Sequence, residues 1–552
     1  MSETAYFDSN ATFGRACARI AGAPYNLAGL IEEMDHCRIS RALVFNAAGR
    51  ELDSRAANRE LATSIGGEVR LAGQAVINTA PWSRKRSLGA ELDEWLELGL
   101  NAFRVFPLWN GVDLGGAQMS EVLKLLAEKK LPLWIDYDSL WYNFSQLGQH
   151  EQRSINIGQI NSLAKEYSDL PIVLVGANWN HHTALFQLLD EAPSVMVDSS
   201  LMQGFEAISY ICSNWGADRL LFGTGMPVYA PGAARAALAY ADISDSERQL
   251  IASGNLERLL GAPATASLPQ PAGRSSILAA ADRGEPLSTK VRILDCHGHI
   301  APVGFDGVNG LTLGPQDGHS IIRRIDRVGI EALCVSSWEI MGGDAPKGNM
   351  EAAAMAAEYP GRILPYAAVN PNYPEDWDTL VEDCFERRNF FGFKPYPTSM
   401  RRAISDPSYR DMLRFADKNT LPILCHFGFE PLAGVSPGEL RMLAPLFPGA
   451  QFIIAHSGAS YRLADEVVDL AVEFDNIFLE INYTSVPFRM ISHLVKYAGV
   501  EKVLFGTDTP MRDPAPILGW VVYDHLSDSE RKAVLSGNFL RLIERTGYKL
   551  GR

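Results

Sequence analysis

Four histidines and one aspartate in the second half of the chain come at the ends of short apolar runs. His297 and His299 end the run VRILDCHGH, while His426, His456 and Asp508 follow LPILC, QFIIA and VLFGT. Imidazoles with a carboxylate and no thiolate are the donors of a catalytic divalent-metal site that keeps an open position. A single histidine after a strand is more often a hydrogen-bonded structural group. Five suitable residues at successive strand ends indicate a metal site.

The elements that position these residues are short apolar runs alternating with longer amphipathic stretches. The candidate strands are VRILDCHGH, EALCVSS, RILPYAAVN, GFKPYP, PILCHFG, QFIIAHSG, NIFLEIN and KVLFGTD. Eight strands alternating with helices over about 250 residues predict a (β/α)8 barrel, whose chemistry lies at the carboxyl ends of the strands. The two-residue period of a strand puts His297 and His299 on one face and turns Cys296 and Gly298 towards the helices.

The whole pattern is repeated within the chain. LFGTGMP at 221–227 and LFGTDTP at 504–510 lie 283 residues apart, and ISDSER with LSDSER and SGNLERLL with SGNFLRLI keep the same offset. Three blocks in one register indicate two fused copies of one fold. We therefore predict an α/β protein of two tandem TIM barrels, 1–262 and 291–552. The linker between them, 263–290, is rich in Ala, Pro and Ser, with helix-favouring residues in SSILAAADR.

The first copy does not carry the histidines. Aligning the repeats places Asn10 and Thr12 opposite the His297–His299 pair, and it places Asp136, Gly176, Gly225 and Arg104 opposite His426, His456, Asp508 and Lys394. Glycine offers no side chain, so an equivalent divalent site cannot form there. The first barrel is predicted to be a pseudo-enzyme. A further hypothesis makes it a permanent pseudo-dimer partner that stabilises the second barrel, with further homo-oligomers left open.

The motifs DxHxH, GFKxY and FGTD, with the histidines of the fifth and sixth strands, resemble the amidohydrolase superfamily. The similarity is to the branch that contains aminocarboxymuconate-semialdehyde decarboxylase and resorcylate decarboxylases. It is strong over 291–545 and weak over 6–262. The resemblance implies that a metal is bound by His297, His299, His426 and Asp508. It also implies that His456 orients or deprotonates the metal's water. We expect one divalent ion per chain, zinc first, with manganese, iron or cobalt as alternatives.

Other residues at predicted strand ends are candidates for contact with substrate. Lys394 ends the fourth strand, where binuclear members of the superfamily carry a carboxylated lysine that bridges two metals. The alternatives for Lys394 are a contact with a substrate anion and a structural ion pair, and a mononuclear site is the first expectation. Trp338 follows the second strand, Arg401 and Arg402 the fourth, and Arg489 the seventh. An arginine fork suits a carboxylate.

Such a site fits more than one reaction. A divalent ion lowers the pKa of bound water and polarises a substrate oxygen. His456 could take a proton near pH 7, because an ordinary imidazole titrates there, and Asp508 could act as ligand and proton shuttle together. The first hypothesis is a hydrolase that cleaves a C–N or C–O bond of a small, carboxylate-bearing molecule. The alternative is non-oxidative decarboxylation. A non-catalytic binding or scaffold protein is the third hypothesis.

Composition narrows the class of partner. The 552 residues include 50 Lys and Arg against 65 Asp and Glu, for a formal net charge of -15. This charge disfavours nucleic acid and anionic lipid as partners, so a small-molecule substrate is expected. Seven scattered cysteines without a CxxC pair do not form a disulfide framework. With no apolar run of membrane-spanning length and no secretory signal, the sequence predicts a cytoplasmic protein.

Overall fold

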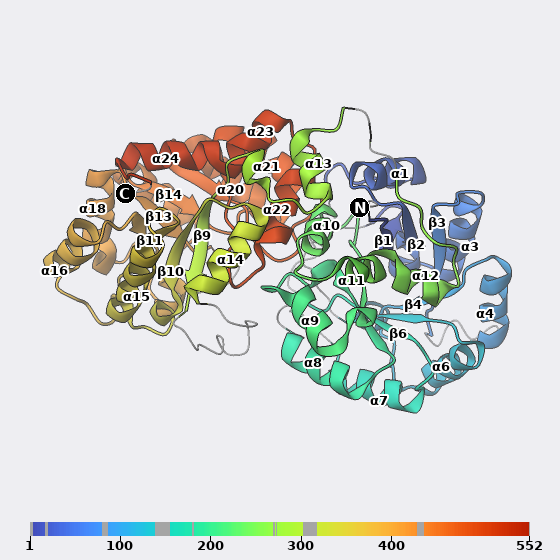
Figure 1. Ribbon diagram of the computed structural model, residues 1–552. Helices are drawn as coiled ribbons and strands as arrows, with labels where there is room; N and C mark the ends of the chain where they lie inside the picture. The colour runs from blue at the N-terminus through green and yellow to red at the C-terminus, as the bar shows by residue number, and fades with distance from the viewer. Residues whose placement is uncertain are drawn as a thin grey trace. The chain divides into compact units, whose positions relative to one another are not determined.

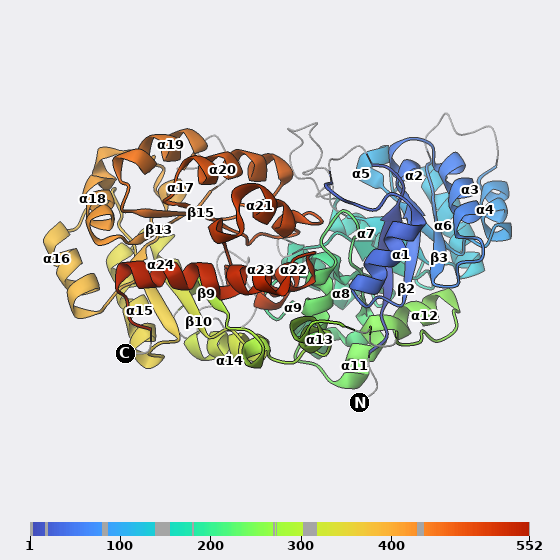
Figure 2. The ribbon, with the colours of Figure 1, turned by 90° about the horizontal axis from the view of Figure 1, so that it is seen from above.

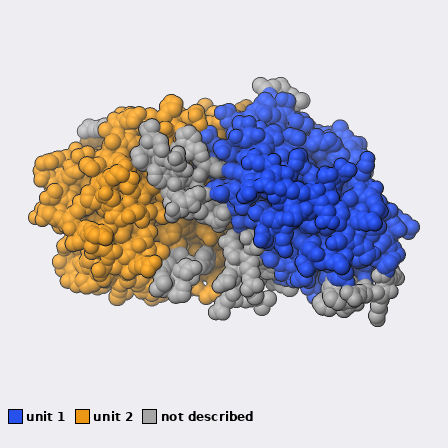
Figure 3. All heavy atoms as spheres, turned by 90° about the horizontal axis from the view of Figure 1, so that it is seen from below, with its two compact units in different colours: residues 1–274 blue, residues 275–552 orange. Residues whose placement is uncertain are grey.

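The computed structural model describes residues 4–16, 20–79, 87–137, 155–178, 181–268, 271, 273–301, 317–427 and 435–550. The chain divides into two compact units, residues 1–274 and 275–552 (Figure 3). We refer to them as unit 1 and unit 2 and describe each by itself. No helix within the described ranges is both long and apolar enough to cross a bilayer.

Each unit is built on a parallel sheet of eight strands in sequential order, which confirms the predicted pair of (β/α)8 barrels (Figure 1). In unit 1 the strands are β1 (Phe7–Phe13), β2 (Arg41–Asn46), β3 (Leu71–Val76), β4 (Ala102–Val105), β5 (Leu133–Asp136), β6 (Ile172–Val175), β7 (Val195–Asp198) and β8 (Leu220–Leu221). In unit 2 they are β9 (Leu294–Ile300), β10 (Ala332–Ser337), β11 (Ile363–Ala367), β12 (Gly392–Phe393), β13 (Pro422–Cys425), β14 (Gln451–Ile454), β15 (Ile477–Glu480) and β16 (Val503–Leu504). Each predicted run of the second copy overlaps one of these strands.

Helices lie outside each sheet (Figures 1 and 2). Those of unit 1 are α1 (Leu27–His36), α2 (Ala47–Glu51), α3 (Ser54–Ile65), α4 (Leu88–Glu97), α5 (Pro107–Asn110), α6 (Ala117–Lys129), α7 (Ile157–Glu166), α8 (His182–Glu191), α9 (Ala207–Trp215), α10 (Gly232–Ala239), α11 (Asp245–Gln249) and α12 (Asn255–Leu260). Those of unit 2 are α13 (Ser276–Asp282), α14 (Gly318–Val328), α15 (Ala345–Glu358), α16 (Trp377–Val381), α17 (Pro397–Met400), α18 (Arg410–Asn419), α19 (Pro437–Leu446), α20 (Tyr461–Glu473), α21 (Met490–Ala498), α22 (Pro514–Tyr523), α23 (Asp528–Lys532) and α24 (Asn538–Thr546).

The repeated sequence blocks form the same local structures in both units. ISDSER and LSDSER begin α11 and α23 with a capping box, in which the serine side chain and the glutamate three residues later satisfy the first backbone amides of the helix. Each of these helices continues into a π-helical turn, Leu250–Gly254 in unit 1 and Ala533–Gly537 in unit 2. Segments that lie 283 residues apart in the sequence therefore adopt the same backbone structure in the two units.

The segment after the last strand closes each barrel onto its first strand. In unit 1, Ser9 donates its backbone N–H to Phe222 (2.8 Å) and Thr12 donates to Met226 (2.9 Å). In unit 2, Cys296 donates to Phe505 (3.0 Å) and His299 donates to Thr509 (2.6 Å). These bonds bring the FGTD segment of unit 2 beside the DCHGH segment, as the barrel prediction requires.

A β-bulge on the first strand of each unit corrects one expectation. Asp295 and Gly298 pair with Leu333 and Val335, so Cys296 and His297 together stand opposite one residue of β10. The extra residue breaks the two-residue period. Cys296 was predicted to face the helices, and this is wrong, because it lies in a buried cluster that draws residues from β9, β10, β11, β13, β14, β15 and β16. Only the interior of a barrel brings those strands together.

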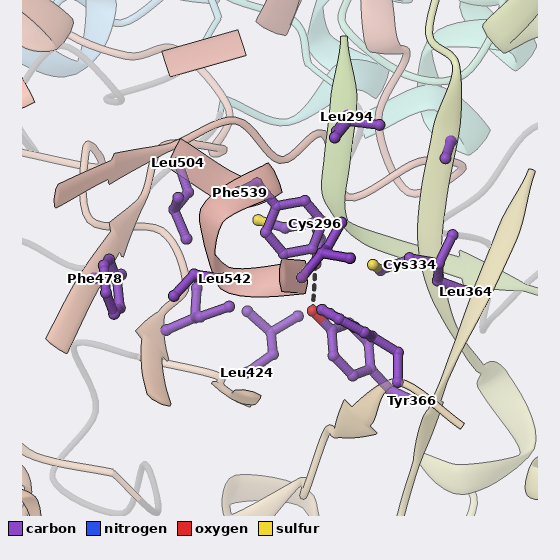
Figure 4. Packing of buried hydrophobic residues seen from close by; sticks show 14 of the residues in the cluster. Leu294, Cys296, Cys334, Leu364, Tyr366, Leu424, Phe478, Leu504, Phe539 and Leu542 are labelled. Atoms are coloured by element: carbon purple, nitrogen blue, oxygen red, sulfur yellow. Dashed lines mark hydrogen bonds between the residues drawn. The ribbon is translucent and has the colours of Figure 1, made fainter. Parts of the chain in front are cut away.

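This cluster is the hydrophobic core of unit 2, and helix α24 completes it. Phe539 and Leu542 of α24 lie among Leu294, Cys296, Leu424, Leu504 and Tyr366, and the Tyr366 hydroxyl donates to the Cys296 carbonyl at 3.1 Å (Figure 4). Leu256 of α12 belongs to the corresponding cluster of unit 1. Burial of these apolar side chains is the main stabilising contribution to each barrel.

The boundary between the units falls inside the predicted linker 263–290. The helix-favouring stretch SSILAAADR forms α13, which belongs to unit 2 and lies against α22. Tyr523 of α22 donates its hydroxyl to Asp282 of α13 at 3.0 Å. The second half of the linker segment is therefore a folded part of unit 2.

Candidate metal centre

Three of the predicted ligands converge at the carboxyl end of the unit 2 barrel. The ligand atoms of His297, His299 and Asp508 all lie within 4.8 Å of one another, and all three residues are buried. Asp508 Oδ1 lies 2.8 Å from His299 Nε2 and 3.3 Å from His297 Nε2. Ligands of one ion at about 2.0–2.1 Å are separated by distances of this size, so this donor set fits a divalent cation.

Two features of the backbone place these donors. The bulge on β9 turns His297 inwards, and Asp508 adopts a left-handed conformation with φ 62° that bends the chain after β16. The Asp508 amide then donates to the His297 carbonyl at 2.7 Å. Buried Asp295 holds the turn by accepting from the Thr507 amide (3.0 Å) and hydroxyl (2.5 Å). Burial raises the pKa of Asp295 to about 7.

Partners that the sequence analysis missed hold the ring of His297. Its Nδ1 lies 3.2 Å from Glu480 Oε2 and 2.7 Å from Asn482 Nδ2. Glu480 ends β15 and also accepts from the amides of His456 and Asn482. Donation from Nδ1 to Glu480 leaves Nε2 of the same ring to face a metal, whereas the Asn482 amide nitrogen is a donor and favours the opposite tautomer. Glu480 and Asn482 lie two residues apart in the run NIFLEIN, so the two-residue period of a strand could have placed both on one face.

His426 and His456 lie beside the three donors without joining their group. His456 Nε2 is 3.4 Å from His426 Nδ1, and the rings of His456 and His297 are 5.4 Å apart. His456 Nδ1 is 2.6 Å from Asn482 Oδ1, which fixes that ring. The assignment of His426 as a fourth ligand stays a prediction. Burial lowers the pKa of His426 to about 3 and that of His456 to about 4, so both rings are neutral at pH 7. The pKa of His456 is therefore lower than the near-neutral value expected from the sequence.

Lys394 and Arg512 are the cations of the site. Lys394 Nζ is in hydrogen-bond contact with Nε2 of His297 and lies 3.4 Å from Nε2 of His299. Burial lowers the pKa of Lys394 to about 8. Arg512 donates from Nη1 to Asp508 Oδ2, and from Nε to Thr484 Oγ1 at 2.8 Å. Arg512 was missed because it stands in a loop four residues after Asp508, where no strand period marks it.

The electrostatics favour the forms in which these donors bind a cation. Burial lowers the pKa of His299 to about 4, and burial with the charge of Lys394 holds the pKa of His297 well below its usual range. Burial alone would raise the pKa of Asp508, but His297 and Arg512 outweigh it and hold that pKa well below its usual range. The site at neutral pH therefore combines neutral imidazoles with an ionised carboxylate.

Of the five residues predicted to contact substrate, the structure brings Lys394 and Trp338 to the site. The indole of Trp338 stacks on the imidazole of His299, with ring centroids 4.1 Å apart and planes 13° apart. Arg401 and Arg402 are exposed, and Arg402 bonds Asn372 Oδ1 at 2.7 Å. Arg489 is half-buried, with Nη2 3.3 Å from His525 Nε2. Within the described residues, no hydrogen bond or ion pair joins these three arginines to the proposed metal ligands.

The corresponding end of the unit 1 barrel holds an ion pair. Arg104 donates to both oxygens of Asp136 at 2.6 and 3.0 Å, and to Asn10 Oδ1 at 2.8 Å. Both charged side chains are buried. Asn10 in turn donates to Asp198, the counterpart of Glu480. The charges of Arg104 and Asp136 neutralise each other. These two residues occupy the positions that correspond to Lys394 and His426 in unit 2.

Comparisons with known proteins find one family whose model matches both units. A model of the Amidohydrolase family matches residues 39–262 and again 294–544. An uncharacterised TIM-barrel protein from Bordetella bronchiseptica is 16% identical over 47% of this chain and 100% of its own, with a TM-score of 0.38. A 5-carboxyvanillate decarboxylase from Sphingomonas paucimobilis is 15% identical over 47% and 100%, with a TM-score of 0.37. A 2,6-dihydroxybenzoate decarboxylase from Rhizobium is 16% identical over 46% and 99%, with a TM-score of 0.36. No curated protein matches the chain.

Proposed function

Because the chain belongs to the Amidohydrolase family, we propose that unit 2 is a metal-dependent hydrolase. It cleaves a C–N or C–O bond in a small, carboxylate-bearing molecule. The observation that carries the proposal is the convergence of His297 Nε2, His299 Nε2 and Asp508 Oδ1 within the barrel mouth. Neutral nitrogen donors with one carboxylate oxygen are typical of a hydrolytic metal site.

The residues present would hold one ion. His297, His299 and Asp508 would ligate it, and His426, whose Nδ1 faces His456, would offer its Nε2 as a fourth donor. A divalent ion held there lowers the pKa of a coordinated water towards neutrality and polarises a substrate oxygen. Zinc is the first choice for this nitrogen and oxygen set, with manganese, iron and cobalt as alternatives.

His456 is the proposed proton acceptor. Asn482 Oδ1 accepts from its Nδ1, which leaves a lone pair on Nε2, and the contact of that atom with His426 is long at 3.4 Å. Asp508 is a weaker candidate for the same role, because its Oδ2 already accepts from Arg512. In this proposal His456 takes the proton from the attacking water and delivers it to the leaving group.

Two residues are proposed to contact the substrate. Lys394 lies next to both histidine ligands, where its amine can bind a substrate anion. Trp338 keeps a buried indole N–H that has no hydrogen-bond partner within the described residues. A buried indole N–H normally finds a partner, so a substrate oxygen is a suitable acceptor. A carbamate on Lys394 bridging a second ion is the competing assignment.

The first experiment measures metal per full-length chain by plasma mass spectrometry. We expect about one equivalent in the wild type and none in His297→Ala/His299→Ala, with Asn10→Ala/Thr12→Ala in unit 1 as the matched control that keeps its metal. About two equivalents would favour the carbamate bridge. An absence of metal after supplementation of the wild type would overturn the proposal.

The second experiment separates hydrolysis from decarboxylation. Carboxylate-bearing amides, esters and lactones are incubated with the metal-loaded protein in water enriched in oxygen-18. A hydrolase incorporates the label into its organic product, whereas a decarboxylase releases carbon dioxide and leaves its organic product unlabelled. Aromatic carboxylic acids are tested in the same way, and release of carbon dioxide from one of them with an unlabelled organic product would replace the proposed reaction by decarboxylation at the same site.

Unit 1 is proposed to act as a non-catalytic partner of unit 2. Its support is the buried Arg104–Asp136 pair, which occupies the barrel end where unit 2 has its donors. Residues 275–552 expressed alone would then be less stable or less active than the full chain. If they are monomeric, equally stable and equally active, this role is wrong.

A further inference from the structure

We propose that Tyr396 is a positioning residue, which holds the ring of His299 with Nε2 towards the metal. This inference rests on the proposed function, because it assigns a role in metal binding. Tyr396 follows β12, two residues after Lys394, and its side chain is buried. It is the acceptor for the one ring proton that His299 carries when Nε2 is a ligand.

The contacts form a short chain of hydrogen bonds. Tyr396 Oη lies 3.2 Å from His299 Nδ1 and 2.6 Å from Ser336 Oγ, and Ser336 Oγ lies 3.5 Å from His299 Nδ1. When His299 Nδ1–H donates to the tyrosine oxygen, the tyrosine hydroxyl donates to Ser336. Trp338 stacks on the face of the same ring. His299 is thus held at its edge by Tyr396 and at its face by Trp338.

Unit 1 shows what these positions carry without a metal ligand. The register of β9 with β10 and of β1 with β2 places Thr12 at the position of His299 and Phe45 at that of Ser336. The motifs NAFRVFP and GFKPYP place Phe106 at the position of Tyr396. Phe45 and Phe106 pack together, with ring centroids 5.3 Å apart. Both hydroxyls are therefore absent where the histidine is absent.

This pattern separates the role of Tyr396 from a purely structural one. Burying a hydroxyl costs free energy that its hydrogen bonds must offset, and a barrel of this fold forms with phenylalanine at both positions. By contrast, Glu480 has an acidic counterpart in Asp198, so a carboxyl at the end of that strand is common to both units. The partners of His299 change from polar to apolar together with the ligand.

The test measures zinc affinity of the full-length protein by competition with a chelating dye at fixed pH. Tyr396→Phe should weaken binding roughly 10–100-fold, the range for partners that orient metal ligands. The matched control is Tyr523→Phe, which removes another buried tyrosine hydroxyl of unit 2, bonded to Asp282 on α13. The control should bind zinc with wild-type affinity, even though the loss of its buried hydrogen bond lowers its melting temperature.

Each outcome has one meaning. Wild-type affinity in Tyr396→Phe overturns the inference and leaves the proposed function standing, whereas a wild type that binds none of zinc, manganese, iron and cobalt overturns the proposed function itself. Should Tyr396→Phe not fold, Ser336→Ala gives a second reading, because it removes the acceptor of the tyrosine hydroxyl. A loss of affinity in Ser336→Ala above that of Tyr523→Phe supports the inference, and equal affinities of these two variants refute it.

Discussion

Unit 1 turns the chain after its sixth and eighth strands through left-handed backbone at Gly176 (φ 82°) and Gly225 (φ 68°). Unit 2 makes the same turns at His456 (φ 65°) and Asp508 (φ 62°). Glycine adopts this conformation freely, whereas another residue loses about 1–3 kcal/mol. The turn is thus a property of the fold, and unit 2 accepts the strain where a side chain is needed at the barrel mouth.

The two barrel ends also differ in how they neutralise charge. In unit 1, Arg104 and Asp136 pair with each other, so their charges do not need to be neutralised by a ligand. In unit 2, Lys394 and Asp508 lie beside the imidazole of His299, whose pKa is lowered by burial. Unit 1 therefore differs from unit 2 by a buried ion pair whose charges neutralise each other, as well as by the absence of the three converged donors.

The largest expected effect comes from giving unit 2 the glycine of unit 1. Asp508→Gly should lower activity and zinc affinity by more than about 100-fold, since even partners outside the ligand sphere contribute up to that much. The fold should survive, because glycine adopts φ 62° without strain. Zinc titration and thermal unfolding check both statements. An active, zinc-binding Asp508→Gly would show that the comparison has picked the wrong ligand.

The next effect is on the stability of unit 1. Arg104→Met or Asp136→Leu alone leaves a buried charge without its partner and should cost about 3–5 kcal/mol, whereas the double variant should cost much less. Urea unfolding of the three variants gives the coupling free energy. If the single and double variants are equally unstable, the ion pair does not replace the chemistry of the site.

A pH dependence should be common to both units. Burial raises the pKa values of Asp8 and Asp295 to about 7, above their value in an unfolded chain. The native state therefore keeps a proton that the unfolded state has released, and stability falls as pH rises from about 4 to 7. Asp8→Asn and Asp295→Asn should each remove about 2–3 kcal/mol of this loss between pH 5 and 7. The free energy of unfolding of each variant is measured at pH 5 and at pH 7. If either variant loses as much stability between these pH values as the wild type does, the prediction is wrong.

The smallest expected effect concerns the exposed arginines. Arg401→Ala and Arg402→Ala should each change stability by no more than about 0.5 kcal/mol, because surface substitutions away from buried networks do little. Steady-state kinetics should be close to those of the wild type for the same reason. A large rise in KM for either variant would return these arginines to the substrate site.

Most of the fold was predictable from the sequence. The 283-residue repeat and the alternation of apolar runs with helical stretches gave the two barrels, and strand order gave the convergence of His297, His299 and Asp508. The orientation of Cys296 was not predictable, because a bulge adds one residue without changing the composition of the strand. Arg512 was not predicted either, because residues in a loop follow no regular spacing in the sequence.

The aspartates that hold the FGT turns bind threonine in both units and are not among the three converged donors. Asp8 accepts from the Thr224 amide at 3.0 Å, as Asp295 does from Thr507. Mutational drift could therefore remove the ligands from a duplicated barrel one at a time without unfolding it. The same separation makes unit 1 a graft scaffold for protein engineering. Because a Cβ at Gly225 would lie 2.5 Å from the Tyr229 ring, that tyrosine is the first residue to replace.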